Sequence, residues 1–311
     1  MSVMNALPYR VLRTLSQGPL AEVHEAIGPK GPAILKVARA EAGGFGAGTG
    51  PAHATQGLAF VTGGVSFADP DPGAVLAAEA KVLAGIDHPA FPRVLAQGEA
   101  AIDGVSRRWM LIELISGQTW RAALEGATKP TPAKLLALAQ VLADVKAQGQ
   151  LGWHGDLKPE NVMIDAAGKP RLIDPTSGAA QEDATGLPAQ LLLTETYNPA
   201  YAMSDLPALG MMLLELLLGA HPLADGAESP PPGRVIGPGL ERWLAGKQVV
   251  GQLRMARRLA CLSLPAGADP RVEACGLRAL GLARTGATLD LAPAPYADVA
   301  AFAADLGQAL G

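Results

Sequence analysis

The first third of the chain alternates short runs of β-branched and apolar residues with turn residues. Gly18-Pro19 and the stretch Gly28–Gly31 separate the first three runs. Short runs bounded by glycine and proline favour an antiparallel arrangement of strands. The pattern predicts strands at 9–15, 22–26, 33–38, 93–97 and 108–114.

Helical spacing appears once in the first third and then dominates. Apolar residues from Val75 to Ile86 recur at helical intervals and predict a helix over 74–86. Thr131 is a suitable N-cap for a helix that Gly149 stops. Further helices are expected at 205–218, 240–260, 270–283 and 296–310, with two short strands inside 153–173. A β-rich start before an α-rich remainder indicates an α+β fold rather than an alternating β/α one.

One segment, at about 42–73, fits neither pattern. It begins with the glycine cluster Gly43–Gly50 and ends in a proline-rich stretch, with a short strand expected at 58–61. A phosphate-binding glycine loop needs a strand before it and a helix after it, and this cluster has neither. We therefore interpret the segment as a flexible Gly-rich insertion.

The composition of the chain excludes several classes of protein. Among 311 residues, 49% are hydrophobic and 17% are charged, which allows a buried core. A net charge of −4 gives no reason to expect a nucleic-acid partner. Cys261 and Cys275, in no metal-binding spacing, make a disulfide framework or a zinc site improbable. The apolar run at 206–218 is short and contains proline, glycine and glutamate, so no membrane segment is expected and the localisation is expected to be cytoplasmic.

The densest group of polar residues is His154-Gly-Asp156-Leu-Lys158-Pro-Glu-Asn161. Phosphoryl transfer needs an oriented nucleophile, metal ions across the phosphates and positive charge near the transferred group. Asp156 can accept or orient the proton of an attacking hydroxyl, and Lys158 can reach the γ-phosphate. Asn161 offers an amide oxygen to Mg²⁺, which prefers oxygen ligands. His154 is interpreted as a structural residue of this loop.

The same residues resemble the catalytic loop of the eukaryotic-type Ser/Thr protein kinases found also in bacteria, and the resemblance runs from about residue 9 to the C-terminus. It implies a bilobal protein-kinase-like fold. The β-rich N-lobe, with one helix called αC in the family, would cover 1–115 and the mainly α-helical C-lobe 116–311. It also implies ATP and Mg²⁺ as cofactors and a protein substrate.

Asp174 resembles the family's second metal ligand. It follows a short strand, as the aspartate of the family's Asp-Phe-Gly triplet does, but Pro175 and Thr176 replace the aromatic residue and the glycine. Proline fixes φ and lacks an N–H group, so the usual movement of that triplet is not expected here. Asp205, before the apolar run at 206–218, resembles the family aspartate that binds backbone N–H groups of the catalytic loop.

Lys36, in Ala33-Ile-Leu-Lys36-Val, resembles the family's nucleotide-binding lysine. A lysine among apolar residues needs a partner, and Glu79 in the predicted helix 74–86 resembles the glutamate that holds it. The resemblance implies that Lys36 binds the α- and β-phosphates. The interval between the two is longer than usual by the insertion at 42–73.

The expected nucleotide contacts in the first lobe are weaker. The stretch from Leu15 to His24 resembles the family's Gly-rich loop, although Gly18 alone of its glycines remains; Gly18 and Val23 are expected near the nucleotide. Backbone groups of Glu113 and Ile115, where the chain passes between lobes, are expected to bind adenine. For Gly18 and Val23 the alternative is a plain hairpin turn without phosphate contact. For Glu113 and Ile115 a buried strand end explains the residues equally well.

Regulation by phosphorylation is not expected. Gly155 precedes Asp156, where many phospho-activated kinases carry arginine, so a phosphate on a nearby segment has no local cation to pair with. We predict that phosphorylation is not required at Ser177, Thr185, Thr194, Thr196 or Tyr197.

Three functions stay open. An active protein Ser/Thr kinase is favoured by Lys158, Asn161 and the apolar run after Asp205. A kinase-fold enzyme for a small molecule is an alternative, because His-Gly-Asp and Ile-Asp-Pro also resemble aminoglycoside and sugar phosphotransferases. A pseudokinase that binds a partner or nucleotide is the third, suggested by the reduced glycine loop and Pro175.

Overall fold

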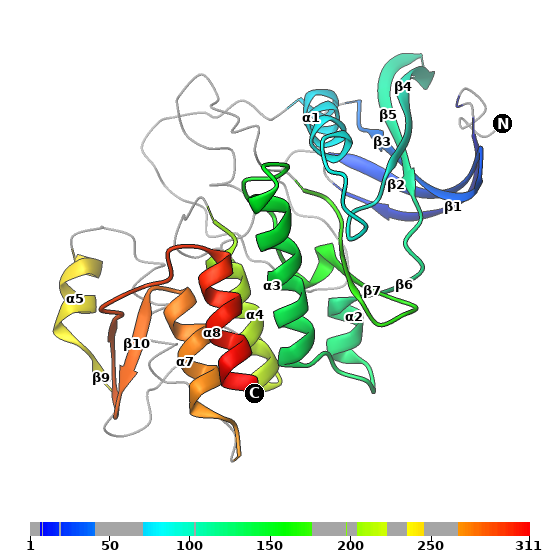
Figure 1. Cartoon of the computed structure of the whole chain (residues 1–311). Helices are drawn as coiled ribbons and strands as arrows, with labels where there is room; N and C mark the ends of the chain where they lie inside the picture. The colour runs from blue at the N-terminus through cyan, green and yellow to red at the C-terminus, as the bar shows by residue number, and fades with distance from the viewer. Residues whose placement is uncertain are drawn as a thin grey trace. The chain divides into compact units, whose positions relative to one another are not determined.

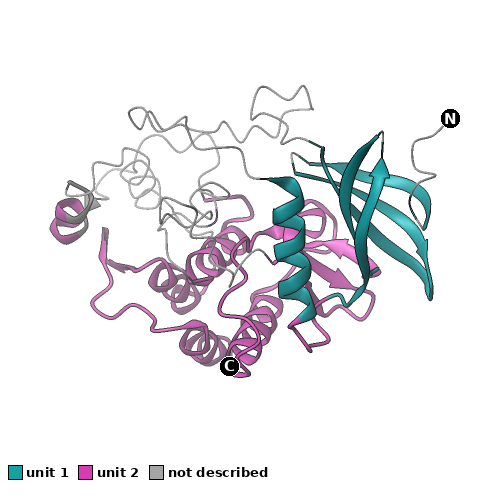
Figure 2. Cartoon of the chain, turned by 90° about the horizontal axis from the view of Figure 1, so that it is seen from above, with its two compact units in different colours: residues 1–84, 92–114 teal, residues 85–91, 115–311 magenta. Residues whose placement is uncertain are grey.

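The computed structural model of the chain describes residues 7, 9–18, 20–40, 71–102, 104–175, 197, 204–222, 235–245 and 267–311. The chain divides into two compact units (Figure 2). The first comprises residues 1–84 and 92–114, and the second comprises residues 85–91 and 115–311. Most of the expected insertion at 42–73, including its strand at 58–61, lies outside the described residues.

The first unit contains a five-stranded antiparallel sheet and one helix (Figure 1). The strand order is β1-β2-β3-β5-β4. All five strands expected from the sequence are present and each is longer than its apolar run, because pairing continues through the polar residues beside it. Their bounds are β1 Arg10–Gln17, β2 Ala21–Gly28, β3 Gly31–Ala38, β4 Val94–Ile102 and β5 Val105–Glu113.

The two faces of this sheet differ. On one face Leu35 and Val37 of β3 join Trp109 and Leu111 of β5 in a buried core. Because side chains alternate along a strand, Lys36 lies on the opposite face. Helix α1 (Pro72–Ala84) contacts β3, β4 and β5 on the face of Lys36. The helix expected at 74–86 is therefore present, but it begins and ends two residues earlier.

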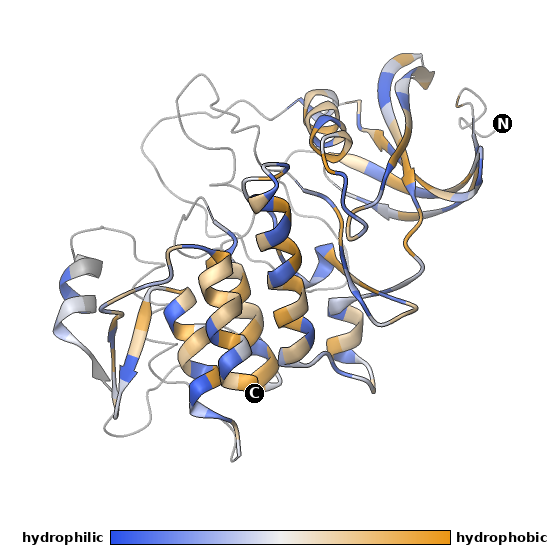
Figure 3. Cartoon of the chain, viewed as in Figure 1, coloured by the Kyte–Doolittle hydropathy of each residue, from blue (hydrophilic) through white to orange (hydrophobic). Residues whose placement is uncertain are grey.

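Helices dominate the second unit (Figure 1). Helix α3 (Pro132–Ala147) begins as predicted, since the Thr131 hydroxyl accepts the N–H of Lys134. Helix α4 (Leu206–Leu218) is mainly hydrophobic (Figure 3), with Glu215 as its one charged residue, and its first ten residues are buried. It contacts α3 and α7 (Pro270–Ala279), and α8 (Val299–Leu310) contacts α3 and α7. Within the described ranges no helix is both long and apolar enough to cross a membrane.

Small residues let α4 and α7 approach closely. A Cβ atom at Gly210 would lie 2.7 Å from the carbonyl oxygen of Gly276, and one at Gly276 would lie 3.1 Å from the Leu214 side chain. Contacts below 3.0 Å do not occur between real Cβ atoms and backbone, so this crossing requires glycine. Helix α4 thus reaches the centre of the unit, where it holds Asp205 at its N-terminal end.

The last third departs from the sequence prediction. The helix expected over 270–283 stops at Ala279, because Gly281 adopts a positive φ of 73° and the chain turns into the hairpin of β10 (Leu282–Thr285) and β11 (Thr288–Leu291). The helix expected at 296–310 begins at Val299 with Asp298 as its cap. A short strand, β9 (Val235–Ile236), pairs with β11. Helix α5 (Pro238–Ala245) overlaps the start of the helix expected over 240–260, and the rest of that range lies outside the described residues.

A second small sheet supports the polar loop of residues 154–161. Its strands are β6 (Gly117–Thr119), β7 (Val162–Asp165) and β8 (Pro170–Leu172), and the last two are those expected inside 153–173. The 3-10 turn η2 (Pro159–Asn161) leads directly into β7, and the short helix α2 (Trp120–Glu125) follows β6. Gly117 is required in β6, because a Cβ atom there would lie 2.1 Å from the Ile164 carbonyl oxygen.

Candidate active site

A buried carboxylate accepts hydrogen bonds from the backbone of the polar loop. Asp205 accepts the N–H of His154 at 2.7 Å and the N–H of Gly155 at 3.2 Å. Burial raises the pKa of Asp205 to about 6, although these two hydrogen bonds oppose the rise. Gly155 has a φ of 89°, which a side chain rarely tolerates. That conformation explains why a glycine, and not an arginine, precedes Asp156.

The His154 ring is buried within the polar loop and connects it to the neighbouring strand end. It is fully buried, and its Nε2–H donates to the carbonyl oxygen of Ile173 at 2.9 Å. Burial lowers the pKa of His154 to about 4, so the ring is neutral at physiological pH. The hydrogen bond ties the loop to the residue before Asp174, as does the bond from the Ile173 N–H to the Asn161 carbonyl oxygen at 3.0 Å. The structural role expected for His154 fits this geometry.

Asp156, Lys158 and Asn161 form one polar cluster. Oδ2 of Asp156 accepts Lys158 Nζ at 2.7 Å and Asn161 Nδ2 at 2.8 Å. Asn161 Nδ2 also donates to the Asp156 carbonyl oxygen at 2.8 Å. Among the described residues, nothing donates to the buried Oδ1 of Asp156. Burial raises the pKa of Asp156, and the nearby Lys158 ammonium acts against the rise. The cluster therefore fixes one oxygen of the carboxylate, while the other is buried and has no donor among the described residues.

Asp174 sits at a strained point of the backbone. Outside glycine, it alone among the described residues has a positive φ, 60°. Such a conformation costs about 1–3 kcal/mol for a side-chain-bearing residue and persists where the surroundings enforce it. The negative charge of Asp174 acts on both His154 and Asp156, so its carboxylate lies within electrostatic reach of the cluster. Pro175 follows it and is buried.

The residues of this cluster suit Mg²⁺ held jointly with phosphate, and not a metal held by protein alone. The described residues contain no group of three or more histidine, cysteine, aspartate or glutamate side chains that could enclose a metal. Mg²⁺ usually takes one or two oxygen ligands from the protein and the rest from phosphate and water. Since the amide nitrogen of Asn161 is engaged by Asp156, its Oδ1 is the atom that can serve as a ligand beside the Asp174 carboxylate.

Lys36 and Glu79 form an ion pair in the first unit. Lys36 Nζ lies 2.5 Å from Glu79 Oε1, and the side chains are 6% and 12% exposed. The pair joins β3 to α1 across the face of the sheet opposite to the Leu35 core. This is the pairing expected from the sequence; the binding of phosphate by Lys36 stays a prediction.

Gly18 and Val23 lie in the turn between β1 and β2 and in the first part of β2. Gly18 closes the turn between β1 and β2, where its N–H donates to the Ala21 carbonyl oxygen at 2.9 Å and its carbonyl accepts Arg39 Nη1 at 2.9 Å. Val23 pairs with Lys36 across β2 and β3. Their contact with a nucleotide stays a prediction.

Glu113 and Ile115 stand on either side of the boundary between the units. Glu113 ends β5, where its N–H donates to the Arg93 carbonyl oxygen at 3.0 Å. Ile115 is 7% exposed and is the first residue of the second unit after β5. The binding of adenine by backbone groups of Glu113 and Ile115 stays a prediction.

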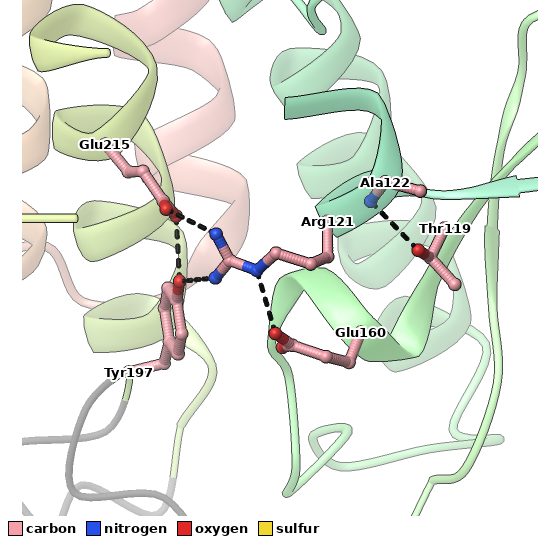
Figure 4. Close-up of polar contacts among 6 residues, drawn as sticks. All are labelled: Thr119, Arg121, Ala122, Glu160, Tyr197 and Glu215. Carbon is pink, nitrogen blue, oxygen red and sulfur yellow. Dashed lines mark hydrogen bonds and ion pairs between the residues drawn. The ribbon is translucent and has the colours of Figure 1, made fainter. Parts of the chain in front are cut away.

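The sequence analysis missed a network centred on Arg121 of α2 (Figure 4). Its Nε donates to Glu160 Oε1 at 2.9 Å, its Nη1 donates to Glu215 Oε1 at 2.7 Å, and its Nη2 donates to the Tyr197 hydroxyl. The Tyr197 hydroxyl donates to Glu215 Oε2 at 2.8 Å. One signal was present in the sequence: a glutamate inside the apolar run at 206–218 needs a buried partner.

The potential phosphorylation sites divide between described and undescribed segments. Ser177, Thr185, Thr194 and Thr196 lie outside the described residues. Tyr197 is 4% exposed and its hydroxyl is engaged by Arg121 and Glu215.

Taken together, the fold and the polar loop define a class: an α+β chain with a β-rich first unit, a helical second unit and a polar loop that resembles the kinase catalytic loop. Comparison with known proteins agrees at this coarse level. No family model matches the chain. A probable serine/threonine-protein kinase of Streptomyces coelicolor is 30% identical over 152 residues, which are 45% of this chain and 23% of the relative. The serine/threonine-protein kinase PknL of Mycobacterium tuberculosis is 32% identical over 155 residues, 46% of this chain and 38% of PknL.

A third relative carries a different description. The O-antigen chain terminator bifunctional methyltransferase/kinase WbdD of Escherichia coli is 39% identical over 92 residues, 29% of this chain and 12% of WbdD. The chain is thus distantly homologous to bacterial Ser/Thr protein kinases over about half of its length. The matched region is about a quarter of the first Ser/Thr kinases it matches, at 23% and 25% of their lengths.

Proposed function

We propose that this chain is an ATP- and Mg²⁺-dependent phosphotransferase that phosphorylates serine or threonine of a protein substrate. The observation that carries the proposal is the Asp156 cluster. One carboxylate oxygen is fixed by Lys158 and Asn161, and the other is buried and accepts no hydrogen bond from the described residues. A hydroxyl placed against Oδ1 would satisfy that oxygen and be oriented for attack.

Each residue then has a distinct task. Asp156 accepts the hydrogen bond, and later the proton, of the attacking hydroxyl. Lys158, whose ammonium already lies at the carboxylate, neutralises charge on the transferred phosphoryl group. Asn161 and Asp174 supply oxygen ligands to Mg²⁺, which when bound offsets the negative charge of the phosphates. Lys36, held by Glu79, binds the α- and β-phosphates, as the family resemblance implies.

A protein acceptor is favoured by the relatives described as serine/threonine-protein kinases. A second candidate follows from the match to the kinase described as an O-antigen chain terminator, which favours a hydroxyl of a glycan or a small molecule. We propose a cytoplasmic location on the sequence evidence given above.

The test is a transfer assay with γ-labelled ATP and Mg²⁺. Purified wild-type protein and an Asp156→Asn variant are incubated alone, with generic protein substrates, and with a panel of metabolites and glycans. Label on protein serine or threonine, absent with Asp156→Asn, supports the proposal. Label on a metabolite or glycan supports the second candidate instead.

A third result would contradict both candidates. If no acceptor is labelled and Asp156→Asn binds ATP as the wild type does, the chain is a binding module without turnover, as in the pseudokinase alternative. The exposed Asp144→Asn on α3 serves as the matched control, because it makes the same chemical change away from the cluster.

A further inference from the structure

Arg121 joins three separate parts of the second unit through one guanidinium group. It contacts Glu160 in the turn η2, Glu215 on α4 and the hydroxyl of Tyr197 (Figure 4). These partners are 39, 94 and 76 residues away along the chain. A planar guanidinium presents its donors in a fixed fork, so bonds in three directions define its position tightly.

The burial of each carboxylate shows which of them needs Arg121 as a partner. The Glu215 side chain is 4% exposed and stands on the apolar helix α4. Both of its oxygens are engaged, Oε1 by Arg121 and Oε2 by Tyr197. A buried carboxylate requires such partners. Glu160, in contrast, is 47% exposed and water can solvate it. Its bond to Arg121 is therefore not explained by the needs of Glu160 itself.

The protonation states in the network are fixed. Burial lowers the pKa of Arg121, but the hydrogen bonds to Glu160 and Glu215 outweigh that effect and raise it. Burial and the nearby Glu215 charge raise the pKa of Tyr197. Arg121 stays charged and Tyr197 stays neutral across the physiological range.

The backbone around Arg121 is also fixed in place. The Thr119 hydroxyl caps α2 by accepting the Ala122 N–H at 3.1 Å, and Trp120, directly before Arg121, is fully buried. The guanidinium is therefore anchored from its own helix and from α4 before it reaches Glu160.

Glu160 is the neighbour of Asn161 in a turn of three residues. Within that turn the Asn161 N–H donates to the Lys158 carbonyl oxygen at 2.9 Å, and the Asn161 side chain holds Asp156. A bond that fixes Glu160 consequently restrains the residues on which the proposed chemistry depends.

We propose that Arg121 is a positioning residue: through Glu160 it holds the turn that carries Asn161, and so sets the placement of Asp156 and Lys158 for phosphoryl transfer. This inference rests on the proposed function for its kinetic consequence. The structural consequence, which is the restraint of the turn, is independent of the proposed function.

The test separates positioning from simple charge neutralisation. Arg121→Gln leaves Glu215 buried beside a neutral partner, which destabilises the fold by itself. The double variant Arg121→Gln with Glu215→Gln removes the buried charge. Arg271→Gln is the matched control, since Arg271 is exposed and, among the described residues, pairs only with the nearby Asp269. For each protein we measure thermal stability, kcat, KM for ATP, and hydrogen exchange of the peptide spanning residues 155–163.

Positioning predicts a split between these readouts. In the double variant stability returns toward wild type, whereas kcat stays about tenfold to a hundredfold lower with KM for ATP unchanged, and exchange in 155–163 stays faster. If the double variant recovers wild-type kcat, Arg121 is a counter-ion of Glu215 only and the inference is wrong. If wild type transfers no phosphate to any acceptor, the proposed function fails by itself. Exchange then decides the inference: wild-type rates in the double variant overturn it, and faster rates support it.

Discussion

The stability of the second unit should depend on pH through one buried histidine. His154 is fully buried, donates to the Ile173 carbonyl from Nε2, and finds no partner for Nδ1 among the described residues. Protonating Nδ1 would place a charge in a site that offers no acceptor for it. We therefore expect acid to destabilise the native state, and the variant His154→Gln, which does not titrate, to remove that part of the effect.

The magnitude follows from the pKa of His154, which burial lowers from 6.5 to about 4. Between these values the unfolded chain binds a proton that the native state does not, so the free energy of unfolding falls as pH falls. The contribution is fully present above pH 6.5 and fully lost below pH 4. At about 1.4 kcal/mol per pKa unit, the loss is about 3 kcal/mol.

Asp205 changes the free energy of unfolding with pH in the opposite direction, so its effect must be separated from that of His154. Burial raises its pKa from 3.8 to about 6, so the native state takes up this proton first. Its contribution to stability therefore rises as pH falls from 6 to 3.8. The wild-type curve alone mixes the two groups, whereas the difference between wild type and His154→Gln isolates the histidine.

The assay is urea unfolding of both proteins between pH 7 and pH 4, at one ionic strength. We expect the stability advantage of wild type over His154→Gln to shrink by about 3 kcal/mol over this range. The ring signals of His154 in NMR spectra should keep their neutral position at pH 5. A constant difference between the two proteins, or a ring that titrates near pH 6.5, would refute the reasoning.

Three other substitutions test separate contacts. Lys36→Met removes the ammonium that lies 2.5 Å from Glu79, so turnover should be lost and thermal unfolding should show a loss of about 3 kcal/mol; an unchanged melting curve contradicts this. Asp174→Asn should weaken the apparent affinity for Mg²⁺ in activity titrations more than that for ATP, and equal effects on both argue against a metal ligand. Gly210→Ala forces a Cβ atom to within 2.7 Å of a backbone oxygen of α7 and should cost about 1–3 kcal/mol in urea unfolding, whereas Gly152→Ala, with open space around it, should cost less.

Caps and the spacing of apolar residues predicted those helices and strands whose ends depend on neighbouring residues in the sequence. Thr131 could be recognised as a cap because the residue type and the apolar spacing after it point to the same helix start. The β10–β11 hairpin could not be recognised, because its strands of four residues are too short for a periodic pattern. The sequence signals for this turn were Gly281 and Gly286, which both adopt a positive φ. These glycines end the helix although the helical spacing of apolar residues continues.

The candidate site was predictable only in part, for a related reason. The resemblance supplied the pairing of Lys36 with Glu79, which no spacing rule would give across so long an interval. Arg121 belongs to no short motif, and its partners come from distant parts of the chain. Only Glu215, a charge within an apolar helix, indicated that a buried cation had to exist.

The distribution of hydrogen bonds in the polar loop separates its frame from its reactive part. The two oxygens of Asp205 and the Nε2–H of His154 are engaged with backbone groups, so the frame has a defined geometry before any ligand arrives. Oδ1 of Asp156, fixed in place by that frame, has no donor among the described residues. Leaving a buried carboxylate oxygen without a partner costs free energy that a purely structural loop would avoid by rearranging. Under the proposed function, this oxygen is the point where a hydroxyl of the substrate would complete the site.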